Sequence, residues 1–224
     1  PFEIRTWTAN MGGGETQQFY YYKAKIISKN AVSDKDFDFK ELLKEIKKAK
    51  PKAQKDKGGS SFVVCLSDWQ MGKRDGDGTK GIVQRIEQMI PDVTQRIKEL
   101  KKQGVPLSNL YVFGLGDIVE GCDGFYAMQT YSVEYDLRRQ KMIARRLLVK
   151  ALKEWSPYFE NVVVACVPGN HGENRKNGKA FTSFGDNYDL SIFDEAAEIF
   201  QENKAYKHIS FIIPENDLWL TLDI

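Results

Sequence analysis

Residues 110–121 read Leu110-Tyr-Val-Phe-Gly-Leu-Gly-Asp117-Ile-Val-Glu120-Gly121. The first four of them form a short apolar run, which is typical of a strand buried on both faces. The glycines at 114 and 116 permit a tight turn, and the carboxylates of Asp117 and Glu120 follow at once. In an open α/β sheet, ligands bind beyond the carboxyl ends of the strands. The segment therefore predicts a buried strand that ends at a binding site.

Two further segments have the same design. Residues 62–66 and 162–167 are apolar runs of strand length, and each is followed by a turn with polar side chains. These turns contain Asp68, Gln70, Asn170 and His171. If the three strands are neighbours in one sheet, the polar side chains come together at one edge.

The segments between these strands have helical periodicity. Apolar positions predict a helix from a cap at Thr79 to Gly104, a long helix from Val133 to Trp155, and another over residues 189–203. Residues 209–213 and 219–224 are predicted to be strands. Buried strands that alternate with helices predict a layered α/β fold with a largely parallel central sheet flanked by helices.

The first part of the chain has a different character. Residues 2–8 and 17–27 alternate like strands around a glycine-rich centre, which predicts a hairpin, and residues 39–50 predict a short helix. A stretch rich in Lys, Gly and Ser then predicts a linker. We therefore expect an appendage of hairpin, helix and linker over residues 1–57 and the main domain over residues 58–224. The aromatic residues 19–22 are either packing or a binding face.

Composition excludes several classes of protein. The 224 residues are 42% hydrophobic and carry a formal net charge of +2, which is too balanced to argue by itself for nucleic-acid or membrane binding. No apolar run approaches the length of a membrane span, and the first residues do not resemble a signal peptide. The three cysteines are widely spaced, so we expect free thiols and a cytoplasmic location, with no membrane partner.

Only two histidines are present, His171 and His208. A site built from several imidazoles is therefore excluded within these residues. Clustered carboxylates require a counter-charge, which a divalent metal usually supplies. Oxygen-rich donors favour Mn²⁺, Mg²⁺ or Fe²⁺ over a thiolate zinc site. Taken singly, each of these turns is equally typical of an ordinary strand-to-helix connection.

The set Asp68-Trp-Gln70, Gly116-Asp117-Ile-Val-Glu120 and Gly169-Asn170-His171 resembles the calcineurin-like metallophosphoesterases. The likeness covers roughly residues 60–224 and is greatest for members found in tailed-phage genomes, with a more distant likeness to double-strand-break-repair nucleases. It implies a layered metallophosphoesterase fold, a dinuclear metal site and hydrolysis by a metal-bound hydroxide. A phage origin would place the protein in the cytoplasm of a bacterial host.

The resemblance also implies roles for individual residues. Asp68 would bind the first metal, Asp117 would bridge both metals, and Asn170 would bind the second. His171 would act as the catalytic acid at the phosphate, and Glu120 would orient the bridging loop rather than bind metal. The implied cofactors are two divalent ions, Mn²⁺ first, with Mg²⁺, Fe²⁺ and Zn²⁺ as alternatives.

The sequence departs from the family pattern in two ways. Gln70 stands where the family usually has histidine, and an amide oxygen is the weaker donor, so Gln70 is either a weak ligand or none. The later histidines of the family are also missing. We therefore expect those ligands beyond Ile224 and a domain that is incomplete at its C-terminus.

Basic residues near the motifs indicate a phosphate ester as substrate. Arg175 and Lys179 follow the third motif and are candidate substrate-binding residues. Basic positions on the 133–155 helix either contact a nucleic-acid backbone or face solvent. We expect a phosphodiesterase, with DNA as the favoured substrate. A non-catalytic scaffold on the same fold and a small-molecule phosphomonoesterase are the alternatives, and a protein partner or a second copy of the chain is compatible with the N-terminal hairpin.

Overall fold

The computed structural model describes residues 2–12, 15–24, 38–53 and 59–224. The chain divides into two compact units, residues 1–31 and residues 32–224. We expected a boundary near residue 58, after a helix. That helix, α1 (Phe39–Lys48), instead belongs to the second unit, where its Glu45 accepts hydrogen bonds from Arg146 and Lys153.

The first unit is the predicted hairpin. Strands β1 (Phe2–Gly12) and β2 (Glu15–Ala24) pair antiparallel, and Trp7 lies opposite Phe19. The rings of these two residues stack with their centroids 5.6 Å apart. Tyr20 and Tyr21 are exposed. Residues 25–27, which we expected to extend the second strand, lie outside the described residues.

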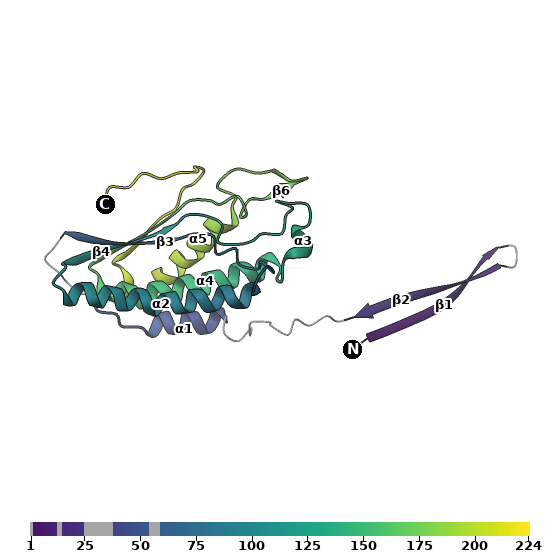
Figure 1. The fold of residues 1–224 in the computed structure, drawn as a ribbon, viewed down its shortest axis with the longest axis horizontal. Helices are drawn as coiled ribbons and strands as arrows, with labels where there is room; N and C mark the ends of the chain where they lie inside the picture. The colour runs from purple at the N-terminus through teal and green to yellow at the C-terminus, as the bar shows by residue number, and fades with distance from the viewer. Residues whose placement is uncertain (1, 13–14, 25–37, 54–58) are drawn as a thin grey trace. The chain divides into compact units, whose positions relative to one another are not determined.

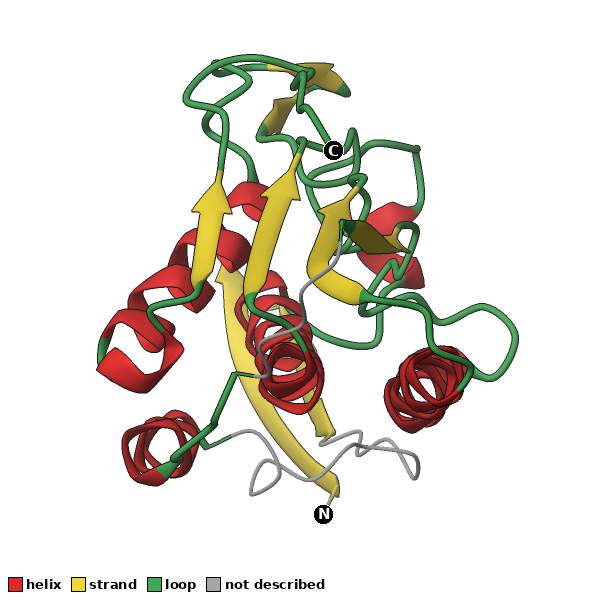
Figure 2. Ribbon diagram, turned by 90° about the vertical axis from the view of Figure 1, so that its left-hand side faces the viewer, coloured by secondary structure: helices red, strands yellow, loops and turns green. Residues whose placement is uncertain are grey.

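The second unit is built on one parallel sheet. Its strands are β3 (Ser60–Leu66), β4 (Leu107–Gly114), β5 (Asn161–Cys166) and β8 (Ile209–Ile212), in that spatial order. The three apolar runs of the sequence are thus adjacent strands, with their carboxyl ends at one edge (Figure 2). The predicted α/β fold with a parallel sheet flanked by helices is confirmed.

Three long helices accompany the sheet: α2 (Gly78–Lys102), α4 (Leu137–Trp155) and α5 (Tyr188–Gln201). In Figure 1, α2 and α4 lie below strands β3 and β4. Their apolar stripes, with the inward side chains of the strands, form the core, in which Leu110, Val112, Leu147 and Leu152 are fully buried. Among the described residues, no helix combines the length and the hydropathy that a membrane crossing requires.

Two predicted helix starts are wrong. Thr79 is not the cap of α2, because the helix begins at Gly78 and the buried Thr79 donates its backbone N–H to Glu134. The long helix begins at Leu137 rather than Val133, because Asp136 caps it by accepting from the backbone N–H of Arg139. The residues before this cap pair instead with the turn after β3.

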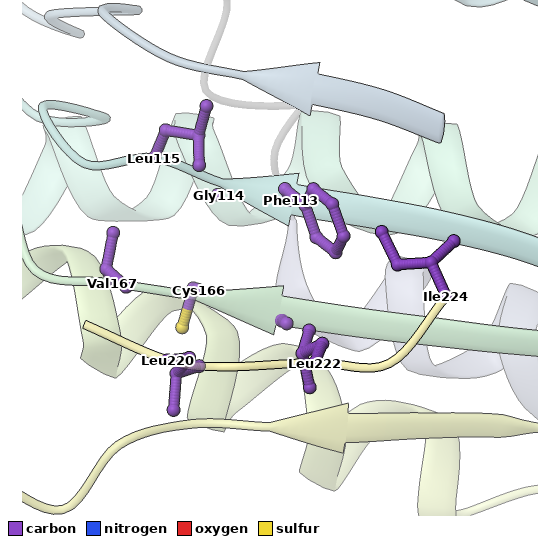
Figure 3. Close-up of a pocket in the computed structure, with 9 residues that line it drawn as sticks. Phe113, Gly114, Leu115, Cys166, Val167, Leu220, Leu222 and Ile224 are labelled. Atoms are coloured by element: carbon purple, nitrogen blue, oxygen red, sulfur yellow. The ribbon is translucent and has the colours of Figure 1, made fainter. Parts of the chain in front are cut away.

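The predicted strand over residues 219–224 is also wrong, because the segment joins no sheet among the described residues. Leu220, Leu222 and Ile224 nevertheless line a cavity of about 240 Å³ together with Phe113 (Figure 3). Leu220 and Leu222 are half-buried, whereas Ile224 is 68% exposed. The alternating pattern that predicted a strand therefore corresponds to an extended segment with one side partly covered.

The basic side chains of α4 hold other helices in place. Arg146 and Lys153 contact Glu45 of α1 at 3.1 and 2.9 Å. Arg145 and Lys141 contact Glu195 of α5. These four cations therefore have acidic partners within the chain, which a helix face dedicated to a nucleic-acid backbone would not require.

Three smaller elements lie at the edge of the sheet where the strands end. Helix α3 (Gln129–Ser132) follows β4, and the short strands β6 (Arg175–Lys176) and β7 (Lys179–Ala180) follow β5. Single 3₁₀ turns over residues 156–158 and 204–206 lie at the opposite edge, just before β5 and β8. The connections that contain the sequence motifs are thus all on the carboxyl side of the sheet.

Candidate metal centre

The three predicted strand ends are joined by backbone hydrogen bonds. Gln70 N–H donates to the carbonyl oxygen of Asp117 at 2.9 Å, and Asp68 N–H donates to that of Gly116 at 3.3 Å. Val167 N–H in turn donates to Gly114. The structure therefore brings together the turns that contain Asp68, Gln70, Asp117, Asn170 and His171, as the sequence predicts.

The turns after β4 and β5 touch each other backbone to backbone. A Cβ atom on Gly116 would lie 2.7 Å from the Cα of Gly169, and one on Gly169 would lie 2.1 Å from the backbone nitrogen of Asp117. Both separations are below 3.0 Å, a distance that Cβ atoms in proteins essentially never show. Glycine is thus required at both positions for the strand ends to approach each other.

Three candidate ligands have strained backbones. Asp68, Gln70 and Asp117 have φ angles of 53°, 42° and 54°, in the left-handed region that non-glycine residues rarely adopt. Such strain persists only where the surrounding structure imposes it, and it is frequent at functional sites. The side chains of these three residues are therefore directed by the turns rather than by local preference.

A buried carboxylate that sequence reasoning missed holds the turns together. Asp189, in the first turn of α5, accepts backbone N–H bonds from Asp117 (2.8 Å), Ile118 (3.1 Å), Val119 (3.0 Å) and Gly169 (3.2 Å). Its side chain is fully buried. Burial raises the pKa of Asp189 to about 6. This carboxylate fixes the backbones on both sides of the candidate site.

Asn187 completes this support. Its side-chain oxygen accepts from the backbone N–H of Asp189 at 2.9 Å, and its amide donates to the carbonyl of Gly169 at 2.8 Å. In the sequence, Asn187 and Asp189 form an Asn-x-Asp pattern at the start of a helix, and this pattern predicts only a helix cap. Nothing in the sequence indicates that the same residues contact the turns after β4 and β5.

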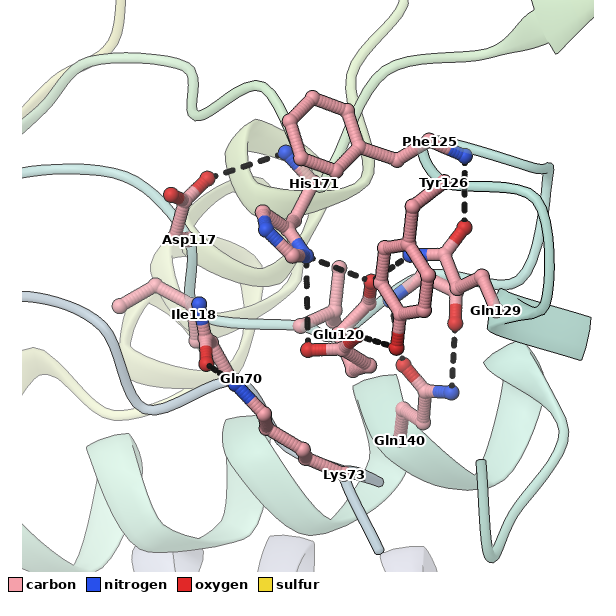
Figure 4. A network of polar contacts seen from close by, with 12 residues as sticks. Gln70, Lys73, Asp117, Ile118, Glu120, Phe125, Tyr126, Gln129, Gln140 and His171 are labelled. Atoms are coloured by element: carbon pink, nitrogen blue, oxygen red, sulfur yellow. Dashed lines mark hydrogen bonds and ion pairs between the residues drawn. The ribbon is translucent and has the colours of Figure 1, made fainter. Parts of the chain in front are cut away.

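His171 lies between the two carboxylates of the second motif (Figure 4). Its backbone N–H donates to Oδ1 of Asp117 at 3.0 Å. Its ring Nδ1 lies 3.0 Å from the carbonyl oxygen of Glu120 and 3.4 Å from Oε2 of the same residue. Since both neighbours are acceptors, Nδ1 carries the proton, and Nε2 is the ring nitrogen left for other chemistry.

The hydrogen bond that His171 donates to the Glu120 side chain raises the pKa of His171 above its ordinary value of 6.5, against the opposing effect of burial. The Phe125 ring packs against the imidazole, with centroids 4.5 Å apart. The imidazole is thus held in one orientation and its protonated form is favoured. Both properties suit a residue that donates a proton.

Glu120 is fully buried, and its two carboxylate oxygens face the side chains of Tyr126 and His171. Its Oε1 accepts from the hydroxyl of Tyr126 at 2.8 Å, and its Oε2 faces His171. Burial alone would raise the pKa of Glu120, but the bonds from His171 and Tyr126 lower it overall. We expected Glu120 to orient the loop around it, and in the structure the group that it contacts is the imidazole of His171.

Two buried glutamines brace the same turn. Gln129 donates to the carbonyl of Glu120 at 2.6 Å, and Gln140 accepts from the backbone N–H of Gly121 at 2.9 Å. Neither residue was singled out from the sequence, because glutamine on a helix usually faces solvent.

Gln70 has a cationic neighbour. Its side-chain oxygen accepts a hydrogen bond from Nζ of Lys73 at 2.7 Å (Figure 4). Asp68 and Asn170 are exposed, and the hydroxyl of Ser67 donates to Asp68. Among the residues that the structure describes, no three His, Cys, Asp or Glu side chains form a group that could hold a metal ion. The available donors are two carboxylates and amide oxygens, which suit a hard cation such as Mn²⁺ or Mg²⁺.

The two candidate substrate-binding residues lie in the β6–β7 hairpin and differ in environment. Arg175 contacts Glu173 and the carbonyl oxygen of Gly178, and its guanidinium lies 4.5 Å from the ring centroid of Phe125. Lys179 is exposed. Arg175 thus holds the hairpin against the Phe125 ring that packs on His171, whereas Lys179 is accessible to a ligand.

Comparison with models of known protein families and with curated proteins finds no match to this chain. The resemblance to metallophosphoesterases therefore stays a hypothesis that depends on the three sequence motifs.

Proposed function

We propose that this chain is a metal-dependent phosphoesterase with a metallophosphoesterase-like fold, and that it hydrolyses a phosphodiester. The observation that carries the proposal is the contact between Asp117 and His171. A candidate metal ligand accepts the backbone N–H of the candidate acid at 3.0 Å, at the carboxyl edge of a parallel sheet. Two groups with complementary roles in phosphate chemistry are thus fixed relative to each other.

In this proposal, the carboxylate and amide side chains bind the metal and His171 donates the proton. Asp117 and Asn170, with Asp68 beside them, present oxygen donors from the ends of adjacent strands. These residues would hold a divalent cation, which would supply Lewis-acid polarisation of the phosphoryl group. His171 keeps Nδ1 on Glu120 and has Nε2 available to protonate the departing oxygen.

Nucleic acid is the substrate class that we favour. Lys176 and Lys179 are exposed on the β6–β7 hairpin, next to Arg175 and its contact with Phe125. Exposed lysines attract a polyanion. The arginines of α4 that pair with Glu45 and Glu195 do not contribute to this argument.

Purified protein assayed with Mn²⁺ tests the proposal. We expect hydrolysis of bis(p-nitrophenyl) phosphate and of linear DNA, and a loss of at least about 100-fold in Asp117→Asn and in His171→Asn. Asp92→Asn, on the exposed side of α2, is the matched control and should retain full turnover. Activity that survives in Asp117→Asn with an unchanged circular dichroism spectrum would overturn the assignment. Faster turnover of p-nitrophenyl phosphate than of either diester would indicate a phosphomonoesterase.

The Lys73–Gln70 contact favours one alternative, a non-catalytic binding module on the same fold. An ammonium group on the Gln70 oxygen competes with a metal for that donor. Such a module would bind DNA or a protein partner without turnover and would retain no Mn²⁺ after dialysis. Mn²⁺ retention that Asp117→Asn abolishes would exclude it.

A further inference from the structure

A second cavity lies between helices α1, α4 and α5 and has a volume of about 450 Å³. Small-molecule sites in proteins usually measure about 300–1,000 Å³, so the cavity is large enough for a small ligand. None of the described residues that line it is a candidate metal ligand. Two aromatic rings and three cations are among its lining residues: Phe39, Tyr188, Arg138, Lys141 and Arg145.

The cations of this cavity outnumber its acids. Arg138, Lys141 and Arg145 are three and four residues apart, so they lie on one face of α4. Glu195 of α5 is the one carboxylate among the described residues that line the cavity, which leaves a net charge of +2. The exposed acidic residues of α1 and α5 do not line it: Glu41, Asp194 and Glu198.

Two of the three cations share a single carboxylate although both are mostly buried. Nζ of Lys141 lies 3.1 Å from Oε1 of Glu195, and Arg145 contacts Oε2 of the same residue. The side chains of Lys141 and Arg145 are only 24% and 15% exposed. The buried Nε of Arg145 has no hydrogen-bond acceptor among the described residues. Because a cation that leaves water needs a compensating charge, an anion in the cavity would be stabilised.

Aromatic surface lies next to this positive charge. Phe39, the first residue of α1, is exposed, and the guanidinium of Arg145 lies 4.6 Å from its ring centroid. The hydroxyl of Tyr188 donates to Asp123 at 3.1 Å and to Asn174. The ring of Tyr188 is therefore the part that remains for a ligand. The cavity thus combines flat apolar surface with an excess of cations.

We propose that this cavity binds a phosphomonoester attached to a flat ring, the class to which nucleoside 5′-monophosphates belong. A phosphomonoester carries about 1.5–2 negative charges at pH 7, which balances the net charge of the lining residues, whereas a carboxylate carries only one. Lys141 and Arg145 contact the phosphate, and Phe39 stacks on the ring. The inference does not rest on the proposed function, because it uses none of the candidate metal ligands.

Binding of AMP to the full chain tests the inference. Isothermal titration calorimetry in the presence of EDTA removes divalent metals, so that neither hydrolysis nor the candidate metal centre contributes to the signal. AMP should bind to the wild type. Adenosine and inorganic phosphate should each bind at least about 10-fold more weakly, since adenosine lacks the charge and phosphate lacks the ring.

Single substitutions place the ligand in the cavity. Lys141→Met should weaken AMP binding by at least about 10-fold, because it removes a charge-assisted hydrogen bond. Lys150→Met removes the same charge from α4 outside the cavity and should leave binding unchanged. Phe39→Ala should weaken the binding of AMP but not that of phosphate. Its control is Phe181→Ala, which removes an exposed ring outside the cavity.

Wild-type protein that binds no AMP at concentrations up to about 1 mM would overturn the inference. AMP binding that neither Lys141→Met nor Phe39→Ala weakens would also overturn it, since the ligand would then lie elsewhere. Tighter binding of benzoate than of AMP would contradict the phosphate assignment. Circular dichroism verifies the fold of each variant, and Lys141→Gln replaces Lys141→Met if the latter does not fold. Each of these results leaves the proposed function intact, because the assay contains no divalent metal.

Discussion

A single buried carboxylate connects two of the three motif-bearing turns. Asp189 accepts four backbone N–H groups from the turns after β4 and β5 and lies at the start of α5. The candidate ligand Asp117 and the glycine before Asn170 are thus fixed by a residue that has no part in the chemistry. At the residue scale, this support is the most specific feature of the site.

Asp189→Ala should therefore destabilise the protein and weaken metal binding together. Four backbone donors would lose their acceptor in a buried place, and unsatisfied groups of this kind cost about 1–3 kcal/mol each before relaxation. We expect a loss of at least about 3 kcal/mol in the free energy of unfolding, measured with urea. Asp194→Asn, which is exposed on the same helix, should change neither stability nor Mn²⁺ affinity. A stable Asp189→Ala variant with normal Mn²⁺ affinity would contradict this account.

The protonation of His171 depends on Glu120. The hydrogen bond that His171 donates to the Glu120 side chain is the largest cause of the raised pKa of His171, so Glu120→Gln should lower that pKa. Proton NMR can follow the change directly, because the chain has only two histidines. If His171 is the acid, the alkaline decline of diester turnover should move to lower pH in Glu120→Gln. An unchanged pKa for His171 would show that the Glu120 side chain is not its partner.

The same pair sets a pH window for stability. The pKa of His171 is raised above 6.5, so its contribution is complete below 6.5 and is lost as the pH rises through the raised value. The pKa of Glu120 is lowered below 4.5, so its contribution is complete above 4.5 and is lost on acidification. Urea unfolding should therefore show the largest difference between wild type and Glu120→Gln between pH 4.5 and 6.5. A difference that does not vary with pH would contradict this.

At the scale of elements, the charged face of α4 forms ion pairs with α1 and α5 of the same chain. Arg146 and Lys153 hold Glu45 of α1, and the pKa of Glu45 is lowered by these two cations although burial alone would raise it. The side chain of Arg146 is only 16% exposed and that of Glu45 is 36% exposed, so solvent screens the pair only in part.

A double-mutant cycle on Glu45→Gln and Arg146→Met should give a coupling energy of about 1 kcal/mol in urea unfolding, at the upper end of values for surface pairs. Neither variant should change turnover or DNA affinity. Arg138→Met is a suitable comparison, because Arg138 lies on the same helix and is exposed. A fall in DNA affinity for Arg146→Met without loss of stability would contradict this account and would show that α4 contacts DNA.

At the scale of the whole second unit, the two faces of the sheet differ. The face toward the helices is the buried core, whereas Val63 and Cys65 on the other face are exposed. The segment with Leu220 and Leu222 lies along the ends of β4 and β5 on this second side, where it lines a cavity with Phe113 (Figure 3).

Cysteine reactivity should report this arrangement. Cys65 is exposed and should react quickly with a thiol reagent, while Cys166 is buried, and burial raises the pKa of its thiol, so it should react slowly. Variants with Cys65 or Cys166 replaced by Ser, each in a Cys122→Ser background, separate the two rates. Equal rates for the two thiols would contradict the difference between the two faces of the sheet.

The sequence by itself determined the parallel sheet and the edge of that sheet at which the three motif-bearing turns meet. Apolar runs of strand length that alternate with amphipathic helices predict a layered α/β arrangement, and the three runs are indeed adjacent strands. The expectation that both faces of these strands are buried is wrong for β3, because Val63 and Cys65 are exposed. The glycines before Asp117 and Asn170 predicted the tight turns correctly, because the lack of a side chain is a property of the residue itself and does not depend on packing. Periodicity placed the ends of the helices less well, since Asp136, and not the apolar pattern, starts α4.

Only the tertiary structure decided which side chains fix the turns of the candidate site and which charged residues lie next to each other. Asp189 and Asn187 look like ordinary helix-capping residues in sequence, and their four-way contact with distant turns arises because α5 packs beside β4 and β5. The partners of Gln70 and of the α4 arginines were equally unpredictable from spacing. Hydrogen bonds and ion pairs act over a few ångströms, and the residues that come within that range are chosen by packing between elements far apart in the chain.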